Sequence, residues 1–257
     1  MSARSLRPWG ALRSSLQQLW RHPWPLLAFS ASTCSLHLLG WGLFSSAESG
    51  GSAVLNTTAH LLGIALYFGS LIWMIDGFTR AGLCLAADEA PRAADLFRWH
   101  GPCSWRLSQG LLLLLGLISL ILMSGFGLWA LLLLLLPPLA PLAVILVVVL
   151  TGGLALSQIF LACWIVSDAI GPLIALKRGL RLLPQRAPAL LALAAVLLLI
   201  ALMPLVLGLI AEVLIEGLGV LVTAVALVIA LPLLASTVTN SFARWTPQAI
   251  GSLKRDC

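Results

Sequence analysis

The chain has 257 residues, of which 60% are hydrophobic and 9% are charged, and its mean hydropathy is +1.05. A soluble domain usually carries about 25% charged residues because water must wet its surface, so this composition excludes an ordinary soluble globular protein. In a soluble protein, the formal net charge of +6 would favour nucleic acid as a binding partner. In a membrane protein, lysine and arginine collect in the cytoplasmic loops, which explains a basic excess, and we expect no nucleic-acid partner.

Long apolar runs indicate an all-α, polytopic membrane protein. A helix crosses the bilayer with about 20 apolar residues, whereas a transmembrane β-barrel would show short alternating segments, which these runs lack. We expect an amphipathic interfacial helix over 1–22, a membrane domain over 23–240 and a cytoplasmic tail over 241–257. The six predicted spans cover about 24–44, 54–75, 107–124, 142–166, 187–211 and 218–239.

The basic residues predict the orientation of these spans. They fall in four groups, and the uncharged stretch 107–166 separates the second group from the third. If two helices cross within that stretch, all fifteen basic residues lie on one side of the membrane, as expected for cytoplasmic loops. Both termini are then cytoplasmic, and the charges of the opposite loops are Glu48, Glu212 and Glu216.

The uncharged stretch is longer than two spans require, so we expect it to break or tilt. Two breaks are visible, at 124–127 (Ser-Gly-Phe-Gly) and at Pro137-Pro138. We expect the first break to end the third span. Residues 129–141 would then lie along the outer interface or enter the membrane as a half-helix, packed on protein.

Two basic segments have leucines at helical spacing and predict interfacial helices on the cytoplasmic side. In the segment after Gly171-Pro172, leucines 173, 176, 180 and 183 would face inward, and Pro184 and Pro188 would end the helix. At the N-terminus, Trp9, Leu12, Leu16, Leu19 and Trp20 would share one face. Each basic residue near an anionic surface contributes about 1 kcal/mol. The expected contacts with anionic headgroups are Arg4, Arg7, Arg21, Lys177, Arg178 and Arg181.

Ionisable residues inside a span are candidates for function. His37 and His60 are about equally far from the loop centre near residue 49, so an antiparallel helix pair would bring them together. Glu212 and Glu216 lie one turn apart at the same outer side, and the four residues would form a cluster for a proton or a metal of unassigned identity. In the alternative interpretation, the histidines form structural hydrogen bonds and the glutamates lie in water.

Asp76 and Asp168 each follow an apolar run. We expect them to cap helix ends, because an aspartate accepts hydrogen bonds from free backbone N–H groups. Alternatively they would pair with Arg80 or Lys177 and gate a cavity. The five scattered cysteines form no C-x-x-C pair, nucleotide-binding and hydrolase motifs are missing from the sequence, and we expect no cofactor.

Three short motifs carry a resemblance to a known family. They are LWRHPWP at 19–25, ADLF at 94–97, and SD-x-x-GP-x-x-AL at 167–176. With these motifs the chain resembles a group of small bacterial six-helix membrane proteins, similar to the membrane domain that precedes some glycerophosphodiester phosphodiesterases. The resemblance implies the architecture but no catalytic residue, and the phosphodiesterase domain is missing from this sequence.

The sequence therefore predicts a non-enzymatic integral membrane protein that organises or assists other membrane components. We expect it in the bacterial inner membrane, in contact with anionic lipid and with a membrane-protein partner. The alternative is a small transporter, or a transporter subunit, for a lipid-like or apolar substrate, with His37, His60 and Pro137-Pro138 near the path. A third possibility is a membrane-embedded enzyme that uses the His/Glu cluster with a metal.

Overall fold

The computed structural model describes residues 8–46 and 53–246, and all regular structure within these ranges is helical. Six stretches of the described residues are long and apolar enough to cross a membrane, which confirms the all-α fold with six candidate spans. The elements are α1 (Pro8–Arg21), α2 (Pro23–Ser46), α3 (Ala53–Ala86), α4 (Ala93–Phe97), α5 (Gly101–Leu135), the 3-10 turn η1 (Pro137–Leu139), α6 (Ala140–Ser157), α7 (Leu161–Ser167), α8 (Pro172–Leu214) and α9 (Leu218–Trp245).

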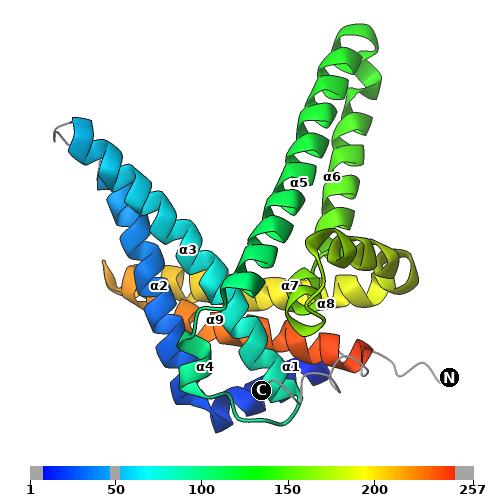
Figure 1. The fold of residues 1–257 in the computed structure, drawn as a ribbon. Coiled ribbons are helices and arrows are strands. Elements are labelled where there is room, and N and C mark those ends of the chain that lie inside the picture. Colours follow the sequence, from blue (N-terminus) through cyan, green and yellow to red (C-terminus); the bar gives the residue numbers. More distant parts are fainter. Residues whose placement is uncertain (1–7, 47–52, 247–257) are drawn as a thin grey trace.

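The long helices form three hairpins, α2–α3, α5–α6 and α8–α9. Figure 1 shows the α2–α3 and α5–α6 hairpins diverging from the part of the molecule that holds α1, α4 and α7. The α5–α6 hairpin turns at η1, where two prolines stand in the first positions. The α8–α9 hairpin turns at Gly217, whose φ of 82° is the left-handed conformation that glycine adopts without strain.

The helix ends opposite the hairpin turns assemble into one packed unit, which we call the base. Its largest cluster of buried side chains joins five helices and includes Leu83, Leu107, Trp164, Leu176 and Phe242. A second cluster, around Phe29 and Phe78, joins α1, α2, α3 and α4. The base comprises α1, residues 23–29 of α2, residues 76–100, residues 101–110 of α5, α7, residues 168–186 and residues 236–245 of α9.

Glycines set the close packing within two of the hairpins. A Cβ on Gly40 would lie 2.6 Å from the backbone nitrogen of Tyr67, and a Cβ on Gly63 would lie 2.7 Å from that of Phe44. In the α5–α6 hairpin, Val147 occupies the space beside Gly125. Small residues let two membrane helices approach closely, so these positions hold the hairpins together.

The predicted break at 124–127 is not present, because α5 continues through it to Leu135. Gly125 serves as a contact with Val147 and leaves the backbone helical. Residues 129–135 therefore belong to α5, and no half-helix forms over 129–141. The second predicted break, Pro137-Pro138, is the turn of the hairpin itself.

Helices α3 and α8 each extend more than ten residues beyond their predicted spans. The second span was predicted to end at residue 75, but α3 continues to Ala86 and buries its extension in the base. The fifth span was predicted to begin at residue 187, after Pro184. The structure has a kink with non-helical backbone at Arg186, since proline removes a backbone donor and crowds the preceding turn. The basic segment therefore precedes the fifth span as predicted, although both belong to α8.

Candidate functional site: arginine contacts in the base

A buried ion pair lies where α3, α4 and α5 meet. The Arg80 guanidinium donates to the Asp76 carboxylate at 3.2 Å, and the exposed fractions of the two side chains are 18% and 0%. Ser104 of α5 donates to the same carboxylate oxygen at 3.4 Å. Of the two ion pairs among the described residues, this one is the more deeply buried. Charge-assisted hydrogen bonds are strong in a low dielectric, so we expect the pair to stabilise the base.

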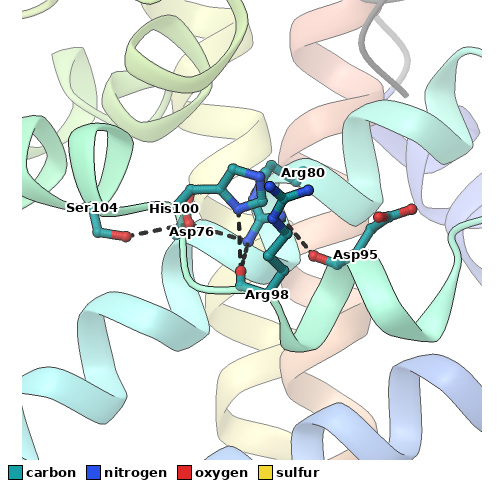
Figure 2. A network of polar contacts seen from close by, with 6 residues as sticks. All are labelled: Asp76, Arg80, Asp95, Arg98, His100 and Ser104. Carbon is teal, nitrogen blue, oxygen red and sulfur yellow. Dashed lines mark hydrogen bonds and ion pairs between the residues drawn. The ribbon is translucent and has the colours of Figure 1, made fainter.

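Arg80 also holds the connection between α3 and α5. Its guanidinium donates to the backbone carbonyls of Asp95 at 2.6 Å and Arg98 at 3.0 Å, as Figure 2 shows. The Arg98 carbonyl also lies 3.1 Å from the His100 ring. Leu96 is buried in the same connection, and Phe97 lies edge-on to Phe29. Arg80 therefore fixes α4 over the buried carboxylate.

The pair retains two buried polar atoms that have no hydrogen-bond partner among the described residues. These are Oδ1 of Asp76 and Nε of Arg80. The carboxylate oxygen is an acceptor and the guanidinium nitrogen is a donor. The Cys103 thiol also lies beside the Asp76 carboxylate.

A second ion pair lies between α7 and α8. Arg178 donates to Asp168, whose carboxylate also accepts from Ser167 at 3.0 Å. The Arg178 guanidinium lies 5.0 Å from the centre of the Trp164 ring, close enough for a cation–π contact. This pair is more exposed than the first, at 41% for Arg178 and 22% for Asp168.

Two further arginines bind backbone carbonyls of neighbouring segments. Arg106 at the start of α5 donates to the carbonyl of Ala169 at 2.6 Å, which fixes the connection between α7 and α8. Arg244 at the end of α9 donates to the carbonyl of Gly10 at 3.1 Å and to Ser14 at 2.9 Å. These arginines stabilise the base internally.

Polar side chains dock α1 onto α9. Asn240 donates to Ser15 at 2.9 Å and to Gln18 at 2.8 Å, and Gln18 donates to the Leu85 carbonyl of α3. Trp9 and Trp20, from the predicted apolar face, are exposed. The helix therefore packs with its Ser15 side against the protein and presents its tryptophans outward.

The residues predicted to contact anionic lipid have different surroundings in the structure. Lys177, Arg181 and Arg21 are exposed. Arg178 is turned towards Asp168 and Trp164. Arg4 and Arg7 lie outside the described residues.

The two histidines have separate surroundings on the α2–α3 hairpin. His37 lies 3.2 Å from the Ser70 hydroxyl and 3.3 Å from the Tyr67 carbonyl, while His60 lies 3.0 Å from its own helix's Asn56 carbonyl and edge-on to Phe44. His60 of α3 is thus level with Phe44 of α2. Phe44 lies seven residues after His37, so the two histidines are separated by about 10 Å along the axis of α2, at 1.5 Å per residue. The Gly40–Gly63 contact sets this register, which differs from the one expected from the loop centre.

The predicted four-residue cluster is not assembled in the structure. Glu212 accepts from the backbone N–H groups of Gly217 at 3.0 Å and Gly219 at 2.9 Å, so it stabilises the α8–α9 turn. Glu216 is exposed at that turn. In the described ranges, no group of three or more His, Cys, Asp or Glu side chains is placed to hold a metal ion.

The predicted caps also differ from the observed contacts. Asp76 does not end a helix, because α3 continues for ten residues beyond it, and its carboxylate pairs with Arg80. Asp168 does stand at the C-terminal end of α7, but its side chain accepts from Ser167 and Arg178. The alternative of ion pairing is thus observed for both residues, with Arg178 in place of Lys177.

Sequence reasoning missed three contacts of the base. It did not connect Arg106 with Ala169, Arg244 with α1, or Asn240 with Ser15. A signal was available for Asn240, because an amide near the end of an apolar span usually has a hydrogen-bond partner. The carbonyl partners of the arginines leave no mark in the sequence, since every residue carries a carbonyl.

No family model, curated protein or solved structure matches this chain. The resemblance to small bacterial six-helix membrane proteins therefore depends on the short motifs alone.

Proposed function

We propose that this protein is a non-enzymatic integral membrane protein that assembles with other membrane components. The observation that supports this proposal most directly is the exposure of the α5–α6 hairpin. Only 6% of the most apolar 18-residue window of α5 is buried. Its outward faces are therefore available to acyl chains or to the helices of a partner.

The distribution of charge supports an orientation with the base on the cytoplasmic side. Every described lysine and arginine lies in the base, whereas Glu212 and Glu216 lie at the α8–α9 turn. Basic residues favour the cytoplasmic side of short loops. In this orientation the base meets the headgroups of the inner leaflet and both termini are cytoplasmic.

The experiment that tests this proposal is purification from nanodiscs, followed by mass spectrometry of the proteins and lipids that remain bound. We expect a stoichiometric protein partner. Met123 on α5 and Met203 on α8 are matched positions, with exposed fractions of 70% and 58%. Met123→Trp should lower recovery of the partner and Met203→Trp should not. Recovery of the protein without any partner would contradict the proposal.

A small transporter for a lipid-like substrate remains the second proposal, supported by an apolar groove at the α5–α6 turn. The groove is lined mainly by Trp129, Leu133, Pro137, Pro141 and Val144, and apolar grooves of this kind suit acyl chains. The histidines lie on the other hairpin, so they would not line this groove. A defined lipid retained without a protein partner would favour the transporter.

A further inference from the structure

One surface of the base combines exposed apolar and basic side chains on the first part of α8, residues 172–185. The opposite side of this segment is firmly packed. Ala175 and Leu176 are buried, and a Cβ on Gly179 would lie 2.4 Å from the Ser157 carbonyl oxygen. The segment is therefore held in one rotation about its axis, which fixes the side chains that face outward.

The exposed face of this segment carries both aliphatic and basic side chains. Leu173 is 65% exposed, Ile174 is 55% exposed and Leu180 is 43% exposed. Lys177 and Arg181 lie among them, one helical turn apart, and both are exposed. A helix with this composition, lying along a membrane, places its apolar side chains among acyl chains and its cations at the phosphates.

Lys177 and Arg181 lack a carboxylate partner among the described residues. The acidic residue nearest to them in sequence, Asp168, is already paired with Arg178. Like charges four residues apart destabilise a helix unless an anion lies between them. The pair therefore favours an anion, and the flanking apolar residues Leu173 and Leu180 favour one that carries an acyl chain.

We infer that Lys177 and Arg181 form a binding site for the phosphate headgroup of an anionic phospholipid, with Leu173, Ile174 and Leu180 against its acyl chains. Arg178 is not part of this site, because Asp168 and Trp164 hold its guanidinium. The inference rests on the proposed orientation, in which the base meets the inner leaflet. Of the six basic residues expected to contact anionic headgroups, the inference assigns two to a defined lipid-binding site.

The test is the double variant Lys177→Gln/Arg181→Gln, compared with Arg92→Gln/Arg98→Gln. The control removes the same charge from exposed residues that flank α4. Each protein is reconstituted in nanodiscs of mixed phosphatidylglycerol and phosphatidylcholine, and native mass spectrometry measures which lipid it retains. If each cation contributes about 1 kcal/mol at the phosphate, the first variant should lose its preference for phosphatidylglycerol by about thirty-fold. The control should lose less, because its arginines do not share the exposed face with Leu173, Ile174 and Leu180.

Equal losses in the two double variants, or no loss in either, would overturn the inference. Excess inorganic phosphate should not displace the lipid, and displacement would show a site for free anions. Because the two side chains are exposed, thermal unfolding of the double variant should match that of the wild type. Recovery of a protein partner is measured separately with Met123→Trp, so failure of the lipid site is distinguishable from failure of the proposed function.

Discussion

Replacement of Arg80 by methionine should destabilise the protein strongly. The variant would leave the Asp76 carboxylate, which has no exposed surface, without its positive partner. It would also remove the hydrogen bonds that hold the carbonyls of Asp95 and Arg98. Removing one partner of a buried ion pair costs about 3–5 kcal/mol, which for a chain of this size lowers Tm by about 10 °C.

The assay is thermal unfolding in mild detergent, combined with hydrogen exchange over residues 87–100. Arg98→Met is the matched control, because it removes an exposed arginine whose carbonyl, and not its side chain, contacts Arg80. The control should change Tm by less than about 2 °C. Exchange over residues 87–100 should rise in Arg80→Met alone, since α4 is then released from α3.

The double variant Asp76→Asn/Arg80→Met separates the pair from its surroundings. Without the buried charge, it should recover more than half of the stability that Arg80→Met loses, and the two positions should couple in a double-mutant cycle. If Arg80→Met unfolds at the same temperature as the Arg98 control, the ion pair does not stabilise the base. If the double variant is no better than Arg80→Met, loss of the carbonyl contacts explains the effect.

Three further predictions concern other contacts of the structure. Arg178→Met should lower the free energy of unfolding by only about 1 kcal/mol, because its pair with Asp168 is partly exposed. A drop in Tm as large as that of Arg80→Met would contradict this prediction. Gly63→Ala should destabilise the α2–α3 hairpin in thermal unfolding, whereas Gly42→Ala, whose Cβ would meet nothing within 4 Å, should be neutral; equal effects would contradict the observed packing. Asn240→Leu should raise hydrogen exchange in α1, and unchanged protection there would show that its hydrogen bonds to α1 are dispensable.

Composition and periodicity were sufficient to predict the helical class and the number of candidate spans. Both follow from the cost of exposing backbone polar groups to lipid, which depends little on details of packing. The kink at Arg186 was also predictable, because proline acts locally on the backbone. Glycine was misleading at 124–127, since its effect depends on whether a neighbouring helix such as α6 packs against it.

The contacts of the site were harder to predict because they depend on register and on distant segments. The histidines were placed level by counting from the loop centre, yet the Gly40–Gly63 contact shifts the two helices relative to each other. Asp76 was assigned to a helix end because a charge usually ends an apolar run. In the structure Arg80, one helical turn further along α3, pairs with Asp76. The helix therefore continues past Asp76 with the carboxylate buried.

The orientation of the three hairpins is the central claim of this account, and labelling of single cysteines tests it most directly. With the native cysteines replaced, one cysteine is placed at Leu139 or Glu216 near the hairpin turns, or at Asp88 or Arg98 in the base. A thiol reagent that does not cross membranes is then added to intact bacterial cells. We expect labelling at positions 139 and 216 without permeabilisation, and at positions 88 and 98 only after it. Labelling of positions 139 and 98 from the same side would contradict the account.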